Sequence, residues 1–185
     1  THSTSSAASD VYKRQVSVNG GLDVEFDSGL YVGTWAAAVG SGAEVDYYGG
    51  YAGEMGDLSF DIGYIKFDYP ALTGAANVDF EEAYLGLGYG DFGFSFASGQ
   101  DGADDNIEIS YGFGDFGFAY GEYDDVGDYF YITYGFELGD FAMTVGYTEF
   151  SDDASTATME DDEDAFFLDI TCLLYTSPSP RDGIG

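Results

Sequence analysis

Basic residues, histidine and cysteine are nearly absent from this chain, and each absence excludes a class of function. Four Lys and Arg stand against 35 Asp and Glu, a formal net charge of −31, so nothing could neutralise the phosphates of a nucleic acid. The single histidine is His2 and the single cysteine is Cys172, so the residues between them offer no Ser–His catalysis, disulfide or cysteine-based metal site. No run of about 18 apolar residues predicts a transmembrane helix. We expect that the protein is not an enzyme.

The two ends of the chain differ from the rest. Residues 5–15 read SSAASDVYKRQ and residues 172–182 read CLLYTSPSPRD. Both resemble in-frame translations of the adapters used in transposon-based sequencing libraries, and segments of this kind are set apart before a fold is considered. We therefore expect 1–15 and 172–185 to be adapter-derived and 16–171 to be one domain from a gene cut at both ends. Within that domain Lys66 is the only basic residue.

Aromatic residues and glycine are what the chain has in abundance. Its 17 Tyr, 16 Phe and 28 Gly supply the apolar surface that a disordered acidic chain lacks. They alternate with small or polar residues, as in NIEISYGF (106–113), and a period of two predicts β-strands. The pattern predicts about eleven strands and an all-β fold. We expect them at 16–26, 30–39, 43–53, 58–69, 78–89, 92–100, 106–113, 116–123, 129–138, 141–150 and 165–171.

A short repeat marks the connections between alternate strands. MGDLSF (55–60), YGDFGF (89–94), FGDFGF (113–118) and LGDFAM (138–143) share an apolar-Gly-Asp-apolar core. Gly followed by Asp favours the tight turn of a β-hairpin. The predicted turn residues are Gly56, Asp57, Gly90, Asp91, Gly114, Asp115, Gly139 and Asp140. The other connections, at 70–77, 100–105, 124–128 and 151–164, are polar and mostly longer, so tight turns gather at one end of the sheet and loops at the other.

That asymmetry is typical of outer-membrane β-barrels, which have short periplasmic turns and longer extracellular loops. We expect an antiparallel up-and-down transmembrane β-barrel in the outer membrane of a Gram-negative bacterium. The large apolar residues, concentrated on one face, would contact outer-membrane lipid, and the other face, dominated by Gly, Ala, Ser and Thr, would line the lumen. The acidic residues expected to line the lumen are Asp23, Glu25, Glu44, Asp46, Asp61, Glu82, Glu108, Glu137 and Asp169.

An interior lined by carboxylates would attract cations and repel anions. The sequence therefore favours a porin or channel for passive passage of small solutes, with a preference for cations. Two alternatives stay open. One is a non-conducting structural barrel, or one that binds ions or partners; the other is a soluble acidic β-protein that binds Ca²⁺.

A family resemblance follows from residues 21–70. The segments GLDVEFDSGLYVGTWAAAV (21–39) and EVDYYGGYAGEMGDLSFDIGYIKFDYP (44–70) resemble the core of the TorF-type (Gcw_chp-like) porins, bacterial outer-membrane proteins of largely unknown function. The matching positions are Phe26, Ser28–Trp35, Glu44, Asp46, Gly49–Tyr51, Gly53–Gly56 and Asp61–Ile65. The likeness is looser but continuous to 171. It implies a barrel of about twelve strands, of which the first would precede the strands seen here.

Two acidic loops suggest a further interaction with metal ions. DGADD (101–105) and DDVGD (124–128) cluster oxygen ligands around glycine, as Ca²⁺ sites do, but neither has the spacing of an EF-hand. Either they are solvated loops that divalent cations bridge loosely, or they form an ordered site. The candidate ligands are Asp101, Asp104, Asp105, Asp124, Asp125 and Asp128. No other cofactor is expected.

Overall fold

The chain folds into a single antiparallel sheet in which each strand pairs with the next along the sequence. The computed structural model describes residues 18–39, 42–70, 79–100, 103–139, 141–152 and 163–171. The strands are β1 (Asn19–Glu25), β2 (Leu30–Val39), β3 (Gly42–Met55), β4 (Leu58–Asp68), β5 (Phe80–Tyr89), β6 (Phe92–Gln100), β7 (Asn106–Phe113), β8 (Phe116–Tyr123), β9 (Gly127–Leu138), β10 (Phe141–Asp152) and β11 (Glu163–Thr171). Across these ranges no helix has the length and apolar character needed to span a bilayer. The predicted all-β meander of eleven strands is confirmed.

Several predicted boundaries are wrong at the acidic connections. β9 begins at Gly127, so the loop expected at 124–128 is shortened to 124–126 and Asp128 belongs to a strand. β10 and β11 likewise extend into the loop expected at 151–164. The β9–β10 ladder continues to the pair Asp152↔Gly127, because pairing with a neighbouring strand holds the backbone extended even where the local sequence is polar. Most of the predicted loop at 70–77 lies outside the described residues.

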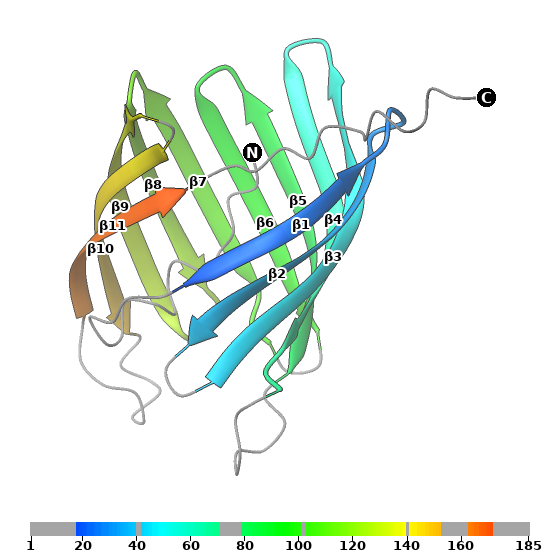
Figure 1. Ribbon diagram of the computed structural model, residues 1–185, viewed down its shortest axis with the longest axis horizontal. Helices are drawn as coiled ribbons and strands as arrows, with labels where there is room; N and C mark the ends of the chain where they lie inside the picture. The colour runs from blue at the N-terminus through cyan, green and yellow to red at the C-terminus, as the bar shows by residue number, and fades with distance from the viewer. Residues whose placement is uncertain are drawn as a thin grey trace.

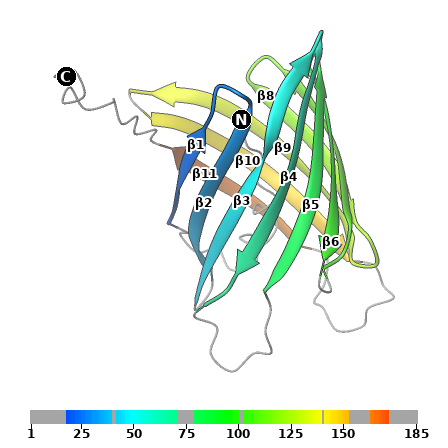
Figure 2. The same cartoon turned by 90° about the vertical axis from the view of Figure 1, so that its right-hand side faces the viewer.

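The sheet twists and curls into a trough, with β1 and β11 at its two edges (Figures 1 and 2). Strongly twisted sheets of many strands tend to curl in this way. Because each strand is antiparallel to the next, β1 and β11 run in the same direction, both toward the end that carries the tight turns. Successive side chains of a strand alternate between the concave and the convex face, and the pairing register carries this alternation from one strand to the next.

The Gly-Asp repeats form the tight turns that the sequence predicts. Met55 pairs with Leu58, so only Gly56 and Asp57 lie between β3 and β4, and the same two-residue spacing recurs at 90–91, 114–115 and 139–140. The first glycine of each turn has a positive φ, between 59° and 66°. The aspartates that follow at 57, 91 and 115 do not have a positive φ, and a positive φ at the first central residue alone is the mark of a type II′ hairpin turn, whose twist matches that of the strands. Asp140 lies outside the described residues.

Replacing one of these turn glycines should destabilise the sheet through backbone conformation alone. A Cβ at Gly114 would meet no other atom, yet its φ of 59° is unfavourable for alanine. We expect Gly114→Ala to lower the free energy of unfolding by about 1–2 kcal/mol. The control is Gly112→Ala on the same hairpin, where φ is not positive and the nearest atom would lie 3.9 Å away. Urea unfolding followed by tyrosine fluorescence compares the two, and an equal effect at both positions would contradict the argument.

Candidate functional site

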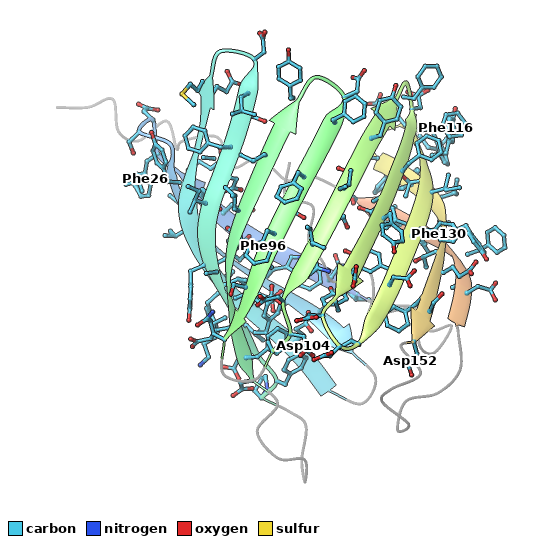
Figure 3. All side chains as sticks on the ribbon, turned by 180° about the vertical axis from the view of Figure 1, so that it is seen from behind. Phe26, Phe96, Asp104, Phe116, Phe130 and Asp152 are labelled. Carbon is cyan, nitrogen blue, oxygen red and sulfur yellow. The ribbon has the colours of Figure 1, made fainter. Side chains whose placement is uncertain are left out.

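The convex face of the sheet is apolar and exposed along almost every strand. Leu22 is 77% exposed, Ile109 58% and Phe166 84%. Figure 3 shows Phe116 and Phe130 projecting outward from this face. Soluble proteins seldom expose contiguous apolar patches larger than a few hundred Å², so a face of this kind is typical of contact with lipid or with another protein.

All nine acidic residues predicted to share one face do share it. Residues that pair across neighbouring strands lie on the same face, so the register can be followed from one acid to another. One row runs from Asp23 through Gly33, Tyr48 and Ile65 to Glu82, and it places Asp23 and Glu82 together on the concave face. Glu44, Asp46 and Glu82 are buried, whereas Asp23, Glu25, Glu137 and Asp169 are exposed. Lys66 lies on the convex face, paired between Tyr47 and Glu81.

The large residues are concentrated on the convex face, as expected, but the concave face also carries aromatic side chains. Five aromatic rings lie on the concave face over the glycine directly opposite on the neighbouring strand, where a Cβ would collide with the ring. Small residues on this face therefore make room for aromatic ones, as cross-strand aromatic–glycine pairs do. The pairs are Tyr48 over Gly33, Tyr31 over Gly50, Tyr84 over Gly63, Tyr129 over Gly121 and Phe167 over Gly146.

Two of these tyrosines meet above a pair of glycines. Tyr31 on β2 and Tyr84 on β5 lie at the ends of the row Tyr31↔Gly50↔Gly63↔Tyr84. Their hydroxyls contact each other, and the Tyr31 hydroxyl also donates to a carboxylate oxygen of Asp61 at 2.6 Å. The arrangement ties four neighbouring strands together through side chains.

The same design recurs on the other side of the trough. Tyr129 on β9 crosses Gly121 on β8 and donates to Glu108 on β7 at 2.9 Å. Tyr131 donates to the other oxygen of Glu108 at 3.2 Å. On β1–β3, Tyr48 crosses Gly33 and donates to Asp23. Tyrosine hydroxyls are thus the hydrogen-bond donors that satisfy carboxylates on a face where the described residues include no Lys or Arg.

A fourth group, a cluster of acids, lies near the end of the trough that carries the longer connections. Glu44 and Asp46 alternate on β3, and both interact electrostatically with Tyr69, as does Glu82 on β5. The Tyr69 hydroxyl, just beyond β4, donates to Glu44. Burial, followed by this hydrogen bond and the three negative charges, raises the pKa of Tyr69 well above its usual range, so Tyr69 stays a donor.

Asp46 is the most buried member of this group. It is 2% exposed, and one of its carboxylate oxygens, Oδ1, has no hydrogen-bond donor among the described residues. Its direct neighbours on the concave face are Trp35 and Phe67, and Phe67 stacks on Phe80 with ring centroids 4.4 Å apart. A buried carboxylate flanked by aromatic rings and lacking a donor is energetically costly unless it is protonated or paired with a cation.

The acidic loops do not assemble a metal site from the described residues. Asp105 uses its carboxylate to accept the backbone N–H of Gly99 at 2.9 Å, and its carbonyl accepts the N–H of Asp124 at 2.9 Å. Asp125 occupies the turn at 124–126 with a φ of 60°, and Asp128 lies on the convex face of β9. Among the residues that the structure describes, no three acidic, His or Cys side chains are close enough to hold one metal ion. Asp101 lies outside them.

The concave tyrosines were missed in the sequence although a signal for them exists. Tyr48, Tyr84 and Tyr129 each have the parity of a predicted lumen acid on their own strand, whereas the strand of Tyr31 contains no acid. A glycine stands opposite each of the four tyrosines in the strand register. Alignment of neighbouring strands on their Gly-Asp turns would have paired Tyr84 with Gly63. Tyrosines therefore need to be assigned to a face by parity and partner, and not by their apolar character alone.

Removing the space that one glycine provides should break the contact between Tyr31 and Tyr84. A Cβ at Gly63 would collide with the Tyr84 ring and lie 2.9 Å from the carbonyl oxygen of Gly49. We expect Gly63→Ala to lower the free energy of unfolding by about 1–3 kcal/mol. Gly86→Ala is the control on the same face, because its nearest contact would be an ordinary 3.7 Å to Asp61 Cβ. If urea unfolding shows the control to be equally destabilised, the packing of Tyr84 over Gly63 is not important.

Comparisons with known proteins identify a family but no characterised relative. The family described as "Bacterial protein of unknown function (Gcw_chp)" matches residues 8–169. No curated protein and no solved structure matches the chain significantly. The match covers β1 to β10 and β11 as far as residue 169, and it includes the three tyrosine–carboxylate groups and the buried cluster around Asp46. The chain is a member of the Gcw_chp family of bacterial proteins.

Proposed function

We propose that this protein is an outer-membrane β-barrel of the TorF type that passes small solutes, with a preference for cations. The observation that carries the proposal is the chemical opposition of the two faces of one curled sheet. The convex face is exposed and apolar, and the concave face holds the nine predicted acids, to which the register adds Glu54 and Asp152. A transmembrane barrel needs this opposition, with an apolar band toward lipid and a polar interior.

Strand length and turn distribution support placement in a membrane. Strands β2 to β5 have 10, 14, 11 and 10 residues, and about 9–11 tilted residues suffice to cross the hydrocarbon core. The two-residue turns all lie at one end of the sheet, which corresponds to the periplasmic end of such barrels. We therefore place the longer connections at the extracellular side.

The direction of the edge strands supports closure by a further strand. β1 and β11 run in the same direction, so a direct seam between them would be parallel. One strand of opposite direction would pair antiparallel with both and would satisfy the free backbone groups that lipid cannot hydrogen-bond. The complete barrel would then have the twelve strands that the resemblance to TorF-type porins implies.

The charge of the concave face supports a preference for cations. The nine acids lie on the concave face, whereas Lys66 lies on the convex one. Carboxylates lining a narrow, low-dielectric passage lower the energy of a cation and raise that of an anion. The mechanism proposed is passive electrostatic selection, without a chemical step.

A non-conducting barrel is the second candidate, and one observation favours it. The hydroxyls of Tyr31 and Tyr84 meet above the concave face, and Tyr129 and Tyr131 cover Glu108. Aromatic side chains that lie over neighbouring strands on the concave face take up interior space, and side chains fill the interior of small barrels. The protein would then have a structural role or bind ions and partners at its ends.

The reversal potential under a salt gradient distinguishes the two candidates. The complete reading frame that contains residues 16–171 is folded in detergent and inserted into a planar bilayer. We expect stepwise conductance with a reversal potential that indicates cation preference. Combined neutralisation by Glu44→Gln, Asp46→Asn and Glu108→Gln should abolish most of this preference, because selectivity of this kind depends on fixed charge near the passage.

The matched control neutralises three acids on the convex face. Asp68→Asn, Glu81→Gln and Glu149→Gln make the same change in net charge away from the concave side. This variant should keep the cation preference. A folded barrel without conductance would contradict the pore and favour the non-conducting barrel. Loss of cation preference in the control would show that the preference depends on overall charge and not on the concave acids.

A further inference from the structure

The cluster around Asp46 combines three buried acidic side chains with a carboxylate oxygen that has no hydrogen-bond donor among the described residues. Glu44, Asp46 and Glu82 are 3%, 2% and 8% exposed, and Asp46 interacts electrostatically with both of the other acids. Carboxylates this close repel one another when they are ionised. Tyr69 donates to Glu44, but Asp46 Oδ1 is buried with no donor among the described residues. The face thus holds an acceptor that a positively charged donor would satisfy.

The spacing of the acids argues against a metal ion. A calcium site needs six to eight oxygen ligands at 2.3–2.6 Å, typically from several side chains. In the described part of the chain, no three acidic, His or Cys side chains are close enough to share one ion. The three carboxylates nevertheless act electrostatically on the same hydroxyl, that of Tyr69. A cation with several separated donors fits this arrangement better than a point charge.

The aromatic neighbours of Asp46 limit further which kind of cation fits the cluster. Trp35 and Phe67 are paired with Asp46 on either side of the same face, and Phe80 stacks on Phe67. A cation over an aromatic ring gains attraction from the negative face of the ring, most strongly over tryptophan. An unsatisfied carboxylate oxygen requires an N–H donor as well as a charge, which a quaternary ammonium cannot supply.

We propose that Glu44, Asp46 and Glu82, with Trp35 and Phe67, form a binding site for organic cations that carry N–H donors, namely alkylammonium or guanidinium groups. An N–H of the cation donates to Asp46 Oδ1, its positive charge relieves the repulsion among the three acids, and its carbon chain contacts the rings. The proposal rests on the proposed function in one respect, since it names the class of solute that the acidic interior would admit.

Trp35 provides a reporter for this site, because it is the only tryptophan in the chain and it pairs directly with Asp46. The probe is 1,4-diaminobutane, titrated into the protein folded in detergent while tryptophan fluorescence is followed. We expect a saturable change. The hexamethyl bis-quaternary analogue has the same charge and spacing but no N–H, and it should bind about tenfold more weakly or worse, as should Ca²⁺.

Two adjacent residues give a matched pair of variants. Glu82 lies on the concave face of β5 and Glu81 on the convex face, so Glu82→Gln and Glu81→Gln make the same charge change on opposite sides. Glu82→Gln and Asp46→Asn should each weaken binding of 1,4-diaminobutane by about tenfold or more, and Glu81→Gln by less than about twofold. Circular dichroism establishes the folding of each variant, and Glu82→Gln carries the test if Asp46→Asn does not fold.

Three results would overturn the site: no saturable change in the folded protein, equal binding of the bis-quaternary analogue or Ca²⁺, or equal loss in Glu81→Gln and Glu82→Gln. Binding is measured without a bilayer, so its outcome is separate from conductance. If the protein conducts cations but does not bind 1,4-diaminobutane, the proposed binding site is wrong and the proposed pore stands. If the protein binds the diamine but does not conduct, the proposed pore is wrong and the proposed binding site stands.

Discussion

The structure depends on the alternation of side chains along paired β-strands. Successive residues of a strand point to opposite faces, and antiparallel pairing passes this parity unchanged from β1 to β11. A slip of one residue at any hairpin would move every later acid onto the apolar face. The two-residue Gly-Asp turns prevent such a slip by fixing the register of four hairpins.

The same register also determines how aromatic side chains pack on the concave face. A tyrosine opposite a glycine can lie flat across the neighbouring strand, and its hydroxyl then reaches an acid one strand further away, as Tyr129 reaches Glu108 across Gly121. Each such group satisfies a carboxylate without a basic residue, which explains how an interior can hold many acids and no Lys or Arg among the described residues. Asp46 lacks this compensation, because its Oδ1 is buried with no donor among the described residues, although Trp35 and Phe67 lie beside it. The proposed cation site therefore lies where a carboxylate oxygen has no tyrosine hydroxyl to donate to it.

Much of this arrangement could be predicted from the sequence, because period-two alternation and Gly-Asp turns are local signals. They gave the eleven strands, the tight turns and the shared face of the nine acids. The roles of Tyr31, Tyr48 and Tyr84 were missed, since a tyrosine suits either face and only the residue opposite decides which packing is available. The extension of β9 to Gly127 was missed for a similar reason. An acidic stretch predicts a loop when it is considered alone, and only its pairing with β10 makes it part of a strand. The burial of Asp46 depends on side chains from three strands, and no local pattern reports it.

The most direct test of the account is the environment of alternate residues along one strand in lipid vesicles. In the reading frame that contains residues 16–171, single cysteines are placed from Ile107 to Gly112 on β7, and each is labelled with a nitroxide. Collision with oxygen, which concentrates in lipid, is compared with collision with a water-soluble nickel complex. The account predicts that labels at Ile107, Ile109 and Tyr111 meet oxygen and that labels at Glu108, Ser110 and Gly112 meet nickel. Equal exposure of both sets to the nickel complex would contradict it, because the convex face would then be in water.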